Sequence, residues 1–171
     1  MNRAVFFDRD GVLNQLVTRD DGYYSPQSFD QFNVFYNAKY VINELRQKDF
    51  LSIVVSNQPD VARGNLKKSE LDKMTKVLIN KLMVDDVFYC THDDSDGCNC
   101  RKPAPGLIIK AAEKWKIDLQ NSFMVGDTWK DAEAAKNVNL KFFLLNAEYN
   151  LDYNSSNRIN NLKNIFNHIE G

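Results

Sequence analysis

Apolar runs of three to five residues alternate with longer amphipathic stretches along the chain. The runs are typical of buried strands and lie at residues 4–7, 51–55, 87–89, 122–125 and 141–145. Apolar side chains at helical spacing predict helices at residues 38–48, 69–83, 105–115, 131–136 and 158–168. Ser69 is the expected N-cap of the second helix. This alternation predicts an α/β fold, a three-layer Rossmann-like parallel sheet with helices on both faces.

One long segment, residues 11–37, follows neither period. It is rich in Asp, Asn, Gln, Ser and Tyr and is too long for an ordinary connection, so we expect an irregular flap over the first strand. The chain of 171 residues can bury one sizeable core but is short for two full-sized domains. We therefore expect a single domain over residues 1–171.

The composition is that of an ordinary soluble globular protein, with 43% hydrophobic and 26% charged residues. No apolar run approaches the length that crosses a bilayer, so we expect no contact with a membrane. The 22 Lys and Arg residues are balanced by 23 Asp and Glu residues, which disfavours nucleic acid as a partner. Residues 1–7 lack the apolar core and cleavage site of a signal peptide, so we expect a cytoplasmic protein. Separately, we expect the protein to be a monomer.

Four polar segments lie at or just after the ends of predicted strands. They are Asp8-Arg9-Asp10-Gly11, Ser56-Asn57-Gln58, Arg101-Lys102-Pro103 and Gly126-Asp127 with Asp131. The carboxyl ends of parallel strands open on one crevice, so residues that are far apart in sequence can surround one ligand there.

The residue types in these segments favour phosphoryl transfer. Asp8 and Asp127 offer carboxylate oxygens to a hard divalent cation, and Mg²⁺ suits one or two carboxylates combined with a substrate phosphate. Asp8 can attack phosphorus and form an aspartyl-phosphate, while the nearby Asp10 can donate a proton and later accept one. The Lys102 ammonium and the Ser56 hydroxyl can hold the equatorial oxygens, where charge accumulates in the transition state.

Each of these residues also has an ordinary explanation when it is taken alone. Asp-x-Asp before glycine is often only a turn, and Asp131 fits the charge preference of a helix N-terminus. Lys102 can be a solvated surface charge, and Gly126-Asp127 can be a simple turn. The functional interpretation therefore depends on the order and placement of all four segments together.

The joint pattern resembles the signatures of the haloacid dehalogenase-like phosphatases. Residues 5–14, which read Val-Phe-Phe-Asp-Arg-Asp-Gly-Val-Leu-Asn, correspond to the first signature. Ser56, Lys102 and the segment Gly126-Asp127-x-x-x-Asp131 match the other three. The resemblance extends over about residues 4–145 and leaves the Asn-rich tail unassigned.

This resemblance implies a role for each matched residue. Asp8 would be the nucleophile, and Asp10 the general acid and base, whose backbone carbonyl also binds Mg²⁺. Asp127 would complete the magnesium site. Asp131 would orient Lys102 rather than bind the ion.

All three cysteines lie in one short segment with one of the two histidines. Cys90-x-His92, followed after five residues by Cys98-x-Cys100, supplies three thiolates and one imidazole, enough to close a tetrahedral shell around Zn²⁺. No position is left for water, so we expect a structural zinc site that fixes the loop at about residues 90–102. The alternative is a loop of free thiols, since three cysteines make a poor disulfide framework.

The cysteine loop resembles that of heptose-bisphosphate phosphatases and of the phosphatase part of histidinol-phosphate enzymes. There it covers the site in place of a separate cap domain. The Ala-Arg-Gly ending of residues 56–64 is similar to the heptose-bisphosphate enzymes, which favours a small sugar phosphate and removal of the 7-phosphate of a heptose 1,7-bisphosphate. The residues that this resemblance implies in the substrate site are Asp21, Gly22, Tyr23, Asn57, Gln58, Arg63, Arg101 and Lys102.

Other functions remain open. Pro59-Asp60 stands where the heptose-bisphosphate enzymes usually carry Ser-Gly, and a carboxylate near a second phosphate is unfavourable. A different sugar phosphate or histidinol phosphate is therefore an alternative substrate, and a polynucleotide end a more distant one. The alternative of another class is a non-catalytic zinc module whose acidic crevice binds a partner or a cation.

Overall fold

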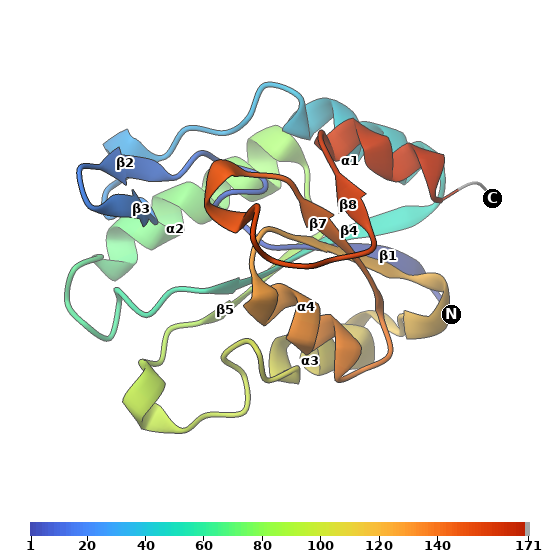
Figure 1. Cartoon of the computed structure of the whole chain (residues 1–171). Helices are drawn as coiled ribbons and strands as arrows, with labels where there is room; N and C mark the ends of the chain where they lie inside the picture. The colour runs from blue at the N-terminus through green and yellow to red at the C-terminus, as the bar shows by residue number, and fades with distance from the viewer. Residues whose placement is uncertain (170–171) are drawn as a thin grey trace.

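The computed structural model describes residues 1–169, which form one central sheet with helices on both faces (Figure 1). Its six strands are all parallel and lie in the order β5-β4-β1-β6-β7-β8. They are β1 (Arg3–Phe7), β4 (Phe50–Asn57), β5 (Asp86–Cys90), β6 (Phe123–Gly126), β7 (Lys141–Leu145) and β8 (Arg158–Ile159). The predicted α/β fold with a parallel sheet is confirmed.

Helices from different parts of the chain cover the two faces (Figure 1). One face carries α1 (Ala38–Gln47), α2 (Lys68–Val77), its π-helical continuation η2 (Leu78–Leu82) and the 3-10 helix η6 (Leu162–Asn167). The other face carries α3 (Gly106–Trp115) and α4 (Trp129–Lys136). Single 3-10 turns are η1 (Phe29–Gln31), η3 (Asp94–Asp96), η4 (Leu119–Asn121) and η5 (Glu148–Asn150).

The sequence of β1 shows why the sheet needs cover on both faces. Val5 and Phe7 pack in the core under α1 and α2, whereas Ala4 and Phe6 pack in the core over α3 and α4. All four side chains are completely buried. Successive strand residues point to opposite faces, so a continuous apolar run is stable only in a sheet that is covered twice.

The tail differs from its prediction. The helix expected at residues 158–168 is instead the short strand β8 followed by η6. Ile159 pairs with Leu145 at the edge of the sheet, and the Asn161 side chain accepts a hydrogen bond from the Lys163 amide at the start of η6. Two asparagines between these elements favour a turn and a cap over a continuous helix.

Two local predictions were also wrong. The flap is not irregular throughout, because β2 (Val17–Arg19) and β3 (Gly22–Tyr24) form an antiparallel hairpin within it. The short strands have no apolar run long enough to signal them in the sequence. Ser69 does not cap α2, since the helix begins at Lys68 and Lys67 occupies the N-cap position.

The chain reverses its winding between the neighbouring strands β1 and β6. The chain leaves β1 towards α1 on one face, whereas it leaves β6 towards α4 on the other face. Such a switch point opens a crevice outside the carboxyl ends of the two strands, which is where open α/β sheets bind ligands. Asp8 follows β1 and Asp127 follows β6, so both carboxylates stand at this point.

None of the helices in residues 1–169 is both long and apolar enough to cross a bilayer.

The first prediction tests whether the tail is part of the core. Ile165 in η6 is completely buried in the cluster under α1, so Ile165→Ala should lower the free energy of unfolding by about 2–5 kcal/mol. Leu151→Ala is the control, because Leu151 is 67% exposed and should be nearly neutral. Urea unfolding measures both, and equal midpoints would show that η6 is not packed on the sheet.

Candidate active site

A crevice of about 780 Å³ opens at the carboxyl edge of the sheet around the switch point. Its lining includes most of the residues that the sequence predicted, namely Asp8, Asp10, Tyr23, Ser56, Asn57, Gln58, Arg63, Arg101, Lys102, Asp127 and Asp131. Side chains that are separated by more than 100 residues in sequence therefore meet in one place, as the parallel sheet requires.

Asp8 has one engaged and one free carboxylate oxygen. Its Oδ1 accepts hydrogen bonds from the Arg9 amide at 2.7 Å and is 2.9 Å from the Lys102 Nζ. Its Oδ2 has no hydrogen-bond partner within residues 1–169. Burial raises the pKa of Asp8 to about 6, although the Lys102 ammonium acts in the opposite direction. The free oxygen faces a crevice large enough for a ligand.

Lys102 is buried between carboxylates. Only 3% of its surface is exposed, and its Nζ is 2.6 Å from Asp131 Oδ1, 2.9 Å from Asp8 Oδ1 and 2.9 Å from the Val55 carbonyl oxygen. Burial alone would lower the pKa of Lys102, but Asp131 and Asp8 outweigh it and raise this pKa above its usual value. The ammonium is therefore charged and held in one position.

Asp131 has no free oxygen for another ligand. Its Oδ1 accepts from Lys102, and its Oδ2 accepts from the Thr128 amide at 3.0 Å and the Thr128 hydroxyl at 2.7 Å. This arrangement is a capping box at the start of α4. Its geometry agrees with a role in orienting Lys102.

Asn57 holds the backbone of Lys102. Its Oδ1 accepts from the Lys102 amide and its Nδ2 donates to the Lys102 carbonyl, both at 3.0 Å. Asn57 was expected in the substrate site, and it does line the crevice. Its amide atoms are nevertheless occupied, so the structure makes it a support for the lysine loop.

Asp127 lies at the base of the crevice and is 2% exposed. Its Oδ1 is buried and has no hydrogen-bond partner within the described residues, whereas its Oδ2 accepts a hydrogen bond from the Tyr149 hydroxyl. Asn150 Nδ2 donates to the Asp127 backbone carbonyl at 2.8 Å. Burial, together with the nearby charges of Asp8 and Asp131, raises the pKa of Asp127 well above its usual value.

Gly11 permits the close approach of the flap to this aspartate. Its φ of +83° is in the left-handed region, and a Cβ atom there would lie 2.1 Å from Asp127 Oδ2. A side chain at this position would push Asp127 or Tyr149 aside.

Asp10 is held by a network of donors. Arg9 Nε and Nη2 donate to its two oxygens at 2.9 Å, Asn14 Nδ2 donates to Oδ1 at 2.9 Å, and Gln58 Nε2 donates to Oδ2 at 2.7 Å. Burial alone would raise the pKa of Asp10, but Arg9 and the amide donors outweigh it and lower this pKa. In this conformation Asp10 is an ionised carboxylate.

Gln58 belongs to the same network. It is 1% exposed, and besides Asp10 its Nε2 donates to Ser56 Oγ at 3.1 Å, while its Oε1 accepts from Arg9. Sequence reasoning placed Gln58 in contact with the substrate. Gln58 does line the crevice, and its amide groups are engaged with Asp10, Ser56 and Arg9, so that it positions Asp10 and Ser56.

Asp21 and Gly22 do not reach the crevice. Arg19 pairs with Gly22 in the hairpin, so Asp20 and Asp21 form the two-residue turn at its tip. Neither Asp21 nor Gly22 belongs to the crevice lining, whereas Tyr23 does. Their role in substrate binding stays a prediction, since both lie at the tip of the hairpin whose Tyr23 does line the crevice.

The predicted arginines connect the crevice to the cysteine loop. Arg63 Nε donates to Asp93 Oδ1 at 2.9 Å, and Arg101 Nε donates to Asp94 Oδ1 at 2.6 Å. Arg101 Nη1 is buried and has no hydrogen-bond partner within residues 1–169. Arg101 lines the crevice, so this unpaired guanidinium nitrogen gives it a charged donor that could serve an anionic ligand.

The cysteine loop brings its four predicted ligands together. The three Sγ atoms of Cys90, Cys98 and Cys100 lie 3.2 to 3.6 Å apart, and His92 Nδ1 is 3.3 Å from Cys100 Sγ and 3.5 Å from Cys90 Sγ. The cysteines are free rather than disulfide-bonded. A tetrahedron with zinc–sulfur bonds of about 2.3 Å has edges of about 3.8 Å, so the cluster is compatible with one metal ion.

Three residues of the site were missed from the sequence. Arg9 is completely buried and holds Asp10, Tyr149 holds Asp127, and Lys130 adds a cation to the crevice. The position of Arg9 between two aspartates, directly after a buried strand, was a usable signal for an internal ion pair. Nothing in the spacing of the tail placed Tyr149 at the crevice.

Comparison with known proteins agrees with this geometry. The family model for haloacid dehalogenase-like hydrolases matches residues 21–145. A D-glycero-beta-D-manno-heptose-1,7-bisphosphate 7-phosphatase from Pasteurella multocida is 32% identical, over 82% of this chain and 79% of the relative. A D-glycero-alpha-D-manno-heptose-1,7-bisphosphate 7-phosphatase from Campylobacter jejuni is 29% identical, over 96% and 94% of the two chains.

A solved structure also matches nearly the whole chain. The D,D-heptose 1,7-bisphosphate phosphatase from B. bronchiseptica, complexed with magnesium and phosphate, superposes with a TM-score of 0.86 at 27% identity and covers 98% of this chain and 97% of its own. Fold and crevice together are those of a phosphatase. The chain belongs to the haloacid dehalogenase-like hydrolase family, which confirms the resemblance seen in the sequence.

The second prediction concerns the buried ion pair in the crevice. Asp131→Asn leaves the Lys102 ammonium with one carboxylate fewer in a buried position and should lower the free energy of unfolding by about 3–5 kcal/mol. Glu133→Gln is the control on the same helix, because its partner Lys136 is 75% exposed and surface pairs contribute little. Chemical denaturation compares the two, and similar losses would contradict the central role of Lys102.

Proposed function

We propose that this protein is a magnesium-dependent phosphatase that removes one phosphate from a heptose 1,7-bisphosphate through an aspartyl-phosphate on Asp8. The observation that carries the proposal is the free Asp8 Oδ2, which faces the crevice while Lys102 holds the other oxygen and Asp127 lies beside it. A carboxylate oxygen without a protein partner, next to a fixed cation, is equipped for nucleophilic attack on a bound phosphate.

The acidic groups fit Mg²⁺. Oxygens of Asp8 and Asp127 lie within 4.8 Å of each other, and the buried Asp127 Oδ1 lacks any protein donor among the described residues. One or two carboxylates with a backbone carbonyl, waters and a phosphate oxygen are the ligands that Mg²⁺ prefers, and we assign the carbonyl to Asp10. The ion would neutralise charge on the transferring phosphoryl group. Asp131 stays outside this set because both its oxygens are engaged.

The protein groups divide the work of phosphoryl transfer. Asp8 Oδ2 forms the bond to phosphorus as the sugar oxygen leaves, and water later releases phosphate from Asp8. Lys102 Nζ and the Ser56 hydroxyl hold the equatorial oxygens, because both lie at the base of the crevice. Asp131 binds the Lys102 ammonium and Asn57 binds the Lys102 backbone, and both contacts keep the lysine side chain oriented.

Asp10 is the proposed proton donor and acceptor. In its present position it is ionised, which suits the later step in which it accepts a proton from the attacking water. The first step needs a protonated Asp10, so its side chain must leave the Arg9 guanidinium and turn towards the leaving oxygen. Arg9 and Gln58, which bind the ionised carboxylate, therefore control whether Asp10 is protonated.

The crevice also suits a second phosphate. Arg101 Nη1 has no protein acceptor in the described chain, and Arg63 and Lys130 line the same crevice. Asp60 was expected to oppose a second phosphate, but its oxygens accept from Gln27 at 3.2 Å and Asn65 at 3.1 Å. The relatives in P. multocida and C. jejuni are named for heptose 1,7-bisphosphates of opposite anomers, so we propose the substrate without its anomer.

We further propose that zinc in the cysteine cluster organises a lid over the crevice. The loop bears Asp93 and Asp94, which bind Arg63 and Arg101, and Cys100 comes directly before Arg101. With the flap, it would cover the site in place of a cap domain, so that the whole chain is one domain. A fixed loop would place Arg101 with little loss of entropy on binding.

The third prediction tests the proposed reaction. Asp8→Asn should abolish release of phosphate from heptose 1,7-bisphosphate in the presence of Mg²⁺, because an amide cannot form the phosphoryl ester. Asp152→Asn, a change at an exposed aspartate outside the crevice, should retain full activity. Assay of inorganic phosphate, with circular dichroism to check folding, measures both. Unchanged turnover by the folded Asp8→Asn variant would refute the mechanism.

The substrate is tested by the same assay. Heptose 1,7-bisphosphate should give the highest kcat/KM in a panel that includes hexose monophosphates, histidinol phosphate and a 5′-phosphorylated oligonucleotide. If histidinol phosphate were turned over faster than every sugar phosphate, the substrate assignment would be wrong while the phosphatase assignment would stand.

The fourth prediction concerns the second phosphate. Arg101→Gln should raise KM for the bisphosphate by about tenfold or more and change kcat little, because it removes the charged donor that we assign to the second phosphate and not to the reacting one. For a heptose 7-monophosphate, which lacks the second phosphate, the same variant should raise KM much less. Arg46→Gln, at an exposed arginine near Asp85, is the control. Equal effects on KM for both substrates would show that Arg101 does not bind the second phosphate.

The fifth prediction concerns the cysteine cluster. Protein purified under reducing conditions without chelator should contain one zinc per chain, as measured by elemental analysis. Cys98→Ser should lose this zinc and raise KM more than it lowers kcat, because the loop that carries the arginine partners is no longer fixed. Ser95→Ala, at an exposed position in the same loop, should keep the metal. Absence of zinc from the wild-type protein would contradict the proposal.

A further inference from the structure

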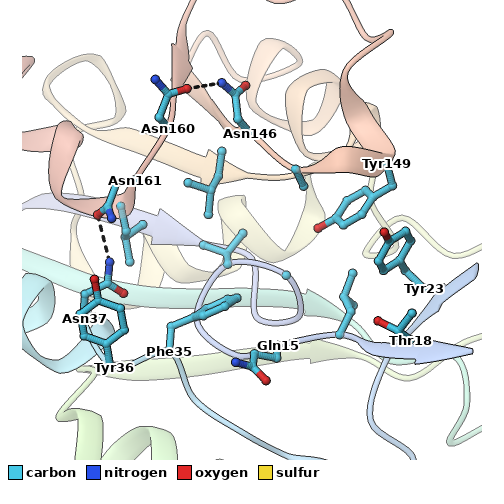
Figure 2. A pocket seen from close by; sticks show the side chains of 16 residues that line it. Gln15, Thr18, Tyr23, Phe35, Tyr36, Asn37, Asn146, Tyr149, Asn160 and Asn161 are labelled. Carbon is cyan, nitrogen blue, oxygen red and sulfur yellow. Dashed lines mark hydrogen bonds between the residues drawn. The ribbon is translucent and has the colours of Figure 1, made fainter.

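A second cavity lies at the same edge of the sheet, beyond the carboxyl ends of β7 and β8 (Figure 2). Its volume is about 470 Å³, within the range of pockets that bind small molecules. The flap, the segment before α1 and the loops after β7 and β8 form its wall. We call it the amide pocket after four of its residues, Asn37, Asn146, Asn160 and Asn161.

A pair of tyrosines separates the amide pocket from the catalytic crevice. Tyr23 and Tyr149 line both cavities, and their ring centroids are 4.9 Å apart. Figure 2 shows them together at one end of the pocket, opposite Asn37 and Asn161. The reactive groups of the crevice are not part of the pocket lining. A molecule bound here would not contact the phosphate that is transferred.

The lining of the amide pocket is uncharged. It contains no Asp, Glu, Lys, Arg or His, whereas the neighbouring crevice includes Arg19, Arg63, Arg101, Lys102 and Lys130. A charged ligand would lose hydration in the pocket without gaining a counter-charge. The pocket is therefore suited to a neutral molecule, and not to the phosphorylated end of a substrate.

Hydrogen bonds fix the orientation of the four asparagine amides. Arg158 Nη1 donates to Asn146 Oδ1 at 2.7 Å, and Asn146 Nδ2 donates in turn to Asn160 Oδ1 at 2.5 Å. Asn37 Nδ2 donates to Asn161 Oδ1 at 2.9 Å. Both amide pairs are visible as dashed lines in Figure 2. The side chains are thus held in place before any ligand binds.

The same hydrogen bonds leave a mixed set of free groups. Asn160 Nδ2, Asn161 Nδ2 and Asn37 Oδ1 have no hydrogen-bond partner within residues 1–169. Asn37 is only 8% exposed, so its free oxygen is a polar atom on a mostly enclosed side chain. Two donors and an acceptor suit hydroxyl groups, which both donate and accept.

Aromatic and aliphatic side chains complete the pocket. Phe35, Tyr36 and the tyrosine pair stand around it, and Val12 and Leu145 are among its apolar residues. Tyr36 is 88% exposed, so its ring is accessible to a molecule in the pocket. Apolar ring faces beside fixed amides match a sugar, which presents C–H groups on its faces and hydroxyls on its rim.

From these observations we infer that the amide pocket is a second binding site, separate from the catalytic crevice, for an uncharged hydroxylated molecule of mono- or disaccharide size.

The test is a titration of the isotope-labelled protein followed by NMR, with D-glucose, D-mannose, D-galactose and maltose as neutral probes. D-glucuronate is the charged counterpart of glucose. At least one neutral sugar should give saturable shifts at the side-chain amides of Asn146, Asn160 and Asn161, and glucuronate should bind at least about tenfold more weakly. Inorganic phosphate, which is expected in the crevice, should not displace the sugar.

Two variants and two matched controls locate the binding. Asn160→Leu and Tyr36→Ala change exposed pocket residues and should each weaken sugar binding by about fivefold or more. Asn33→Leu and Tyr40→Ala alter exposed residues outside the pocket and should leave it unchanged. None of these variants touches the groups proposed to act on phosphate.

Three results would overturn the inference. They are the absence of saturable shifts with every neutral sugar, equal weakening by the pocket variants and their controls, and displacement of the sugar by phosphate. The last would place the sugar in the catalytic crevice. Because the titration needs neither turnover nor Mg²⁺, its outcome is independent of the proposed phosphatase reaction.

Discussion

The site depends on one buried ammonium group among carboxylates. Lys102 is nearly inaccessible to solvent and contacts both Asp8 and Asp131, in a cluster that also holds Asp127. Without that cation the aspartates would repel one another in a region of low dielectric, and without the aspartates the lysine would be an uncompensated buried charge. The groups proposed to act on phosphate therefore also stabilise the fold, so that their substitution affects stability as well as activity.

The position of this lysine is determined by parts of the chain that lie far apart in sequence. Asn57 at the end of β4 binds the Lys102 backbone, and Thr128 with Asp131 at the start of α4 fixes its ammonium. The cysteine cluster ends two residues before it, at Cys100. Three loops at one sheet edge thus converge on a single side chain, which is possible because parallel strands direct all their carboxyl ends to the same side.

Sequence reasoning recovered the parts of this arrangement that have a strong period or a joint motif. The strand before Asp8 and the four signature segments were located because apolar runs and their order are visible in the sequence. The two-residue strand β8 and the flap hairpin are too short to leave a period. Asn57 and Gln58 were correctly expected at the crevice, but their bonds to Lys102 and Asp10 could not be foreseen, since an amide at a strand end can face a ligand or the protein equally well.

The tail was the least predictable part of the chain, yet it closes the site. Tyr149 and Asn150 bind Asp127 from η5, and the Tyr23 hydroxyl of the flap donates to Glu148 on the same turn. Flap and tail therefore hold each other across the sheet edge, and their tyrosines form the partition between a charged crevice and an uncharged pocket. A change in either segment can reach Asp127 without any movement of the sheet, because the Tyr23 ring of the flap contacts Tyr149, whose hydroxyl donates to Asp127.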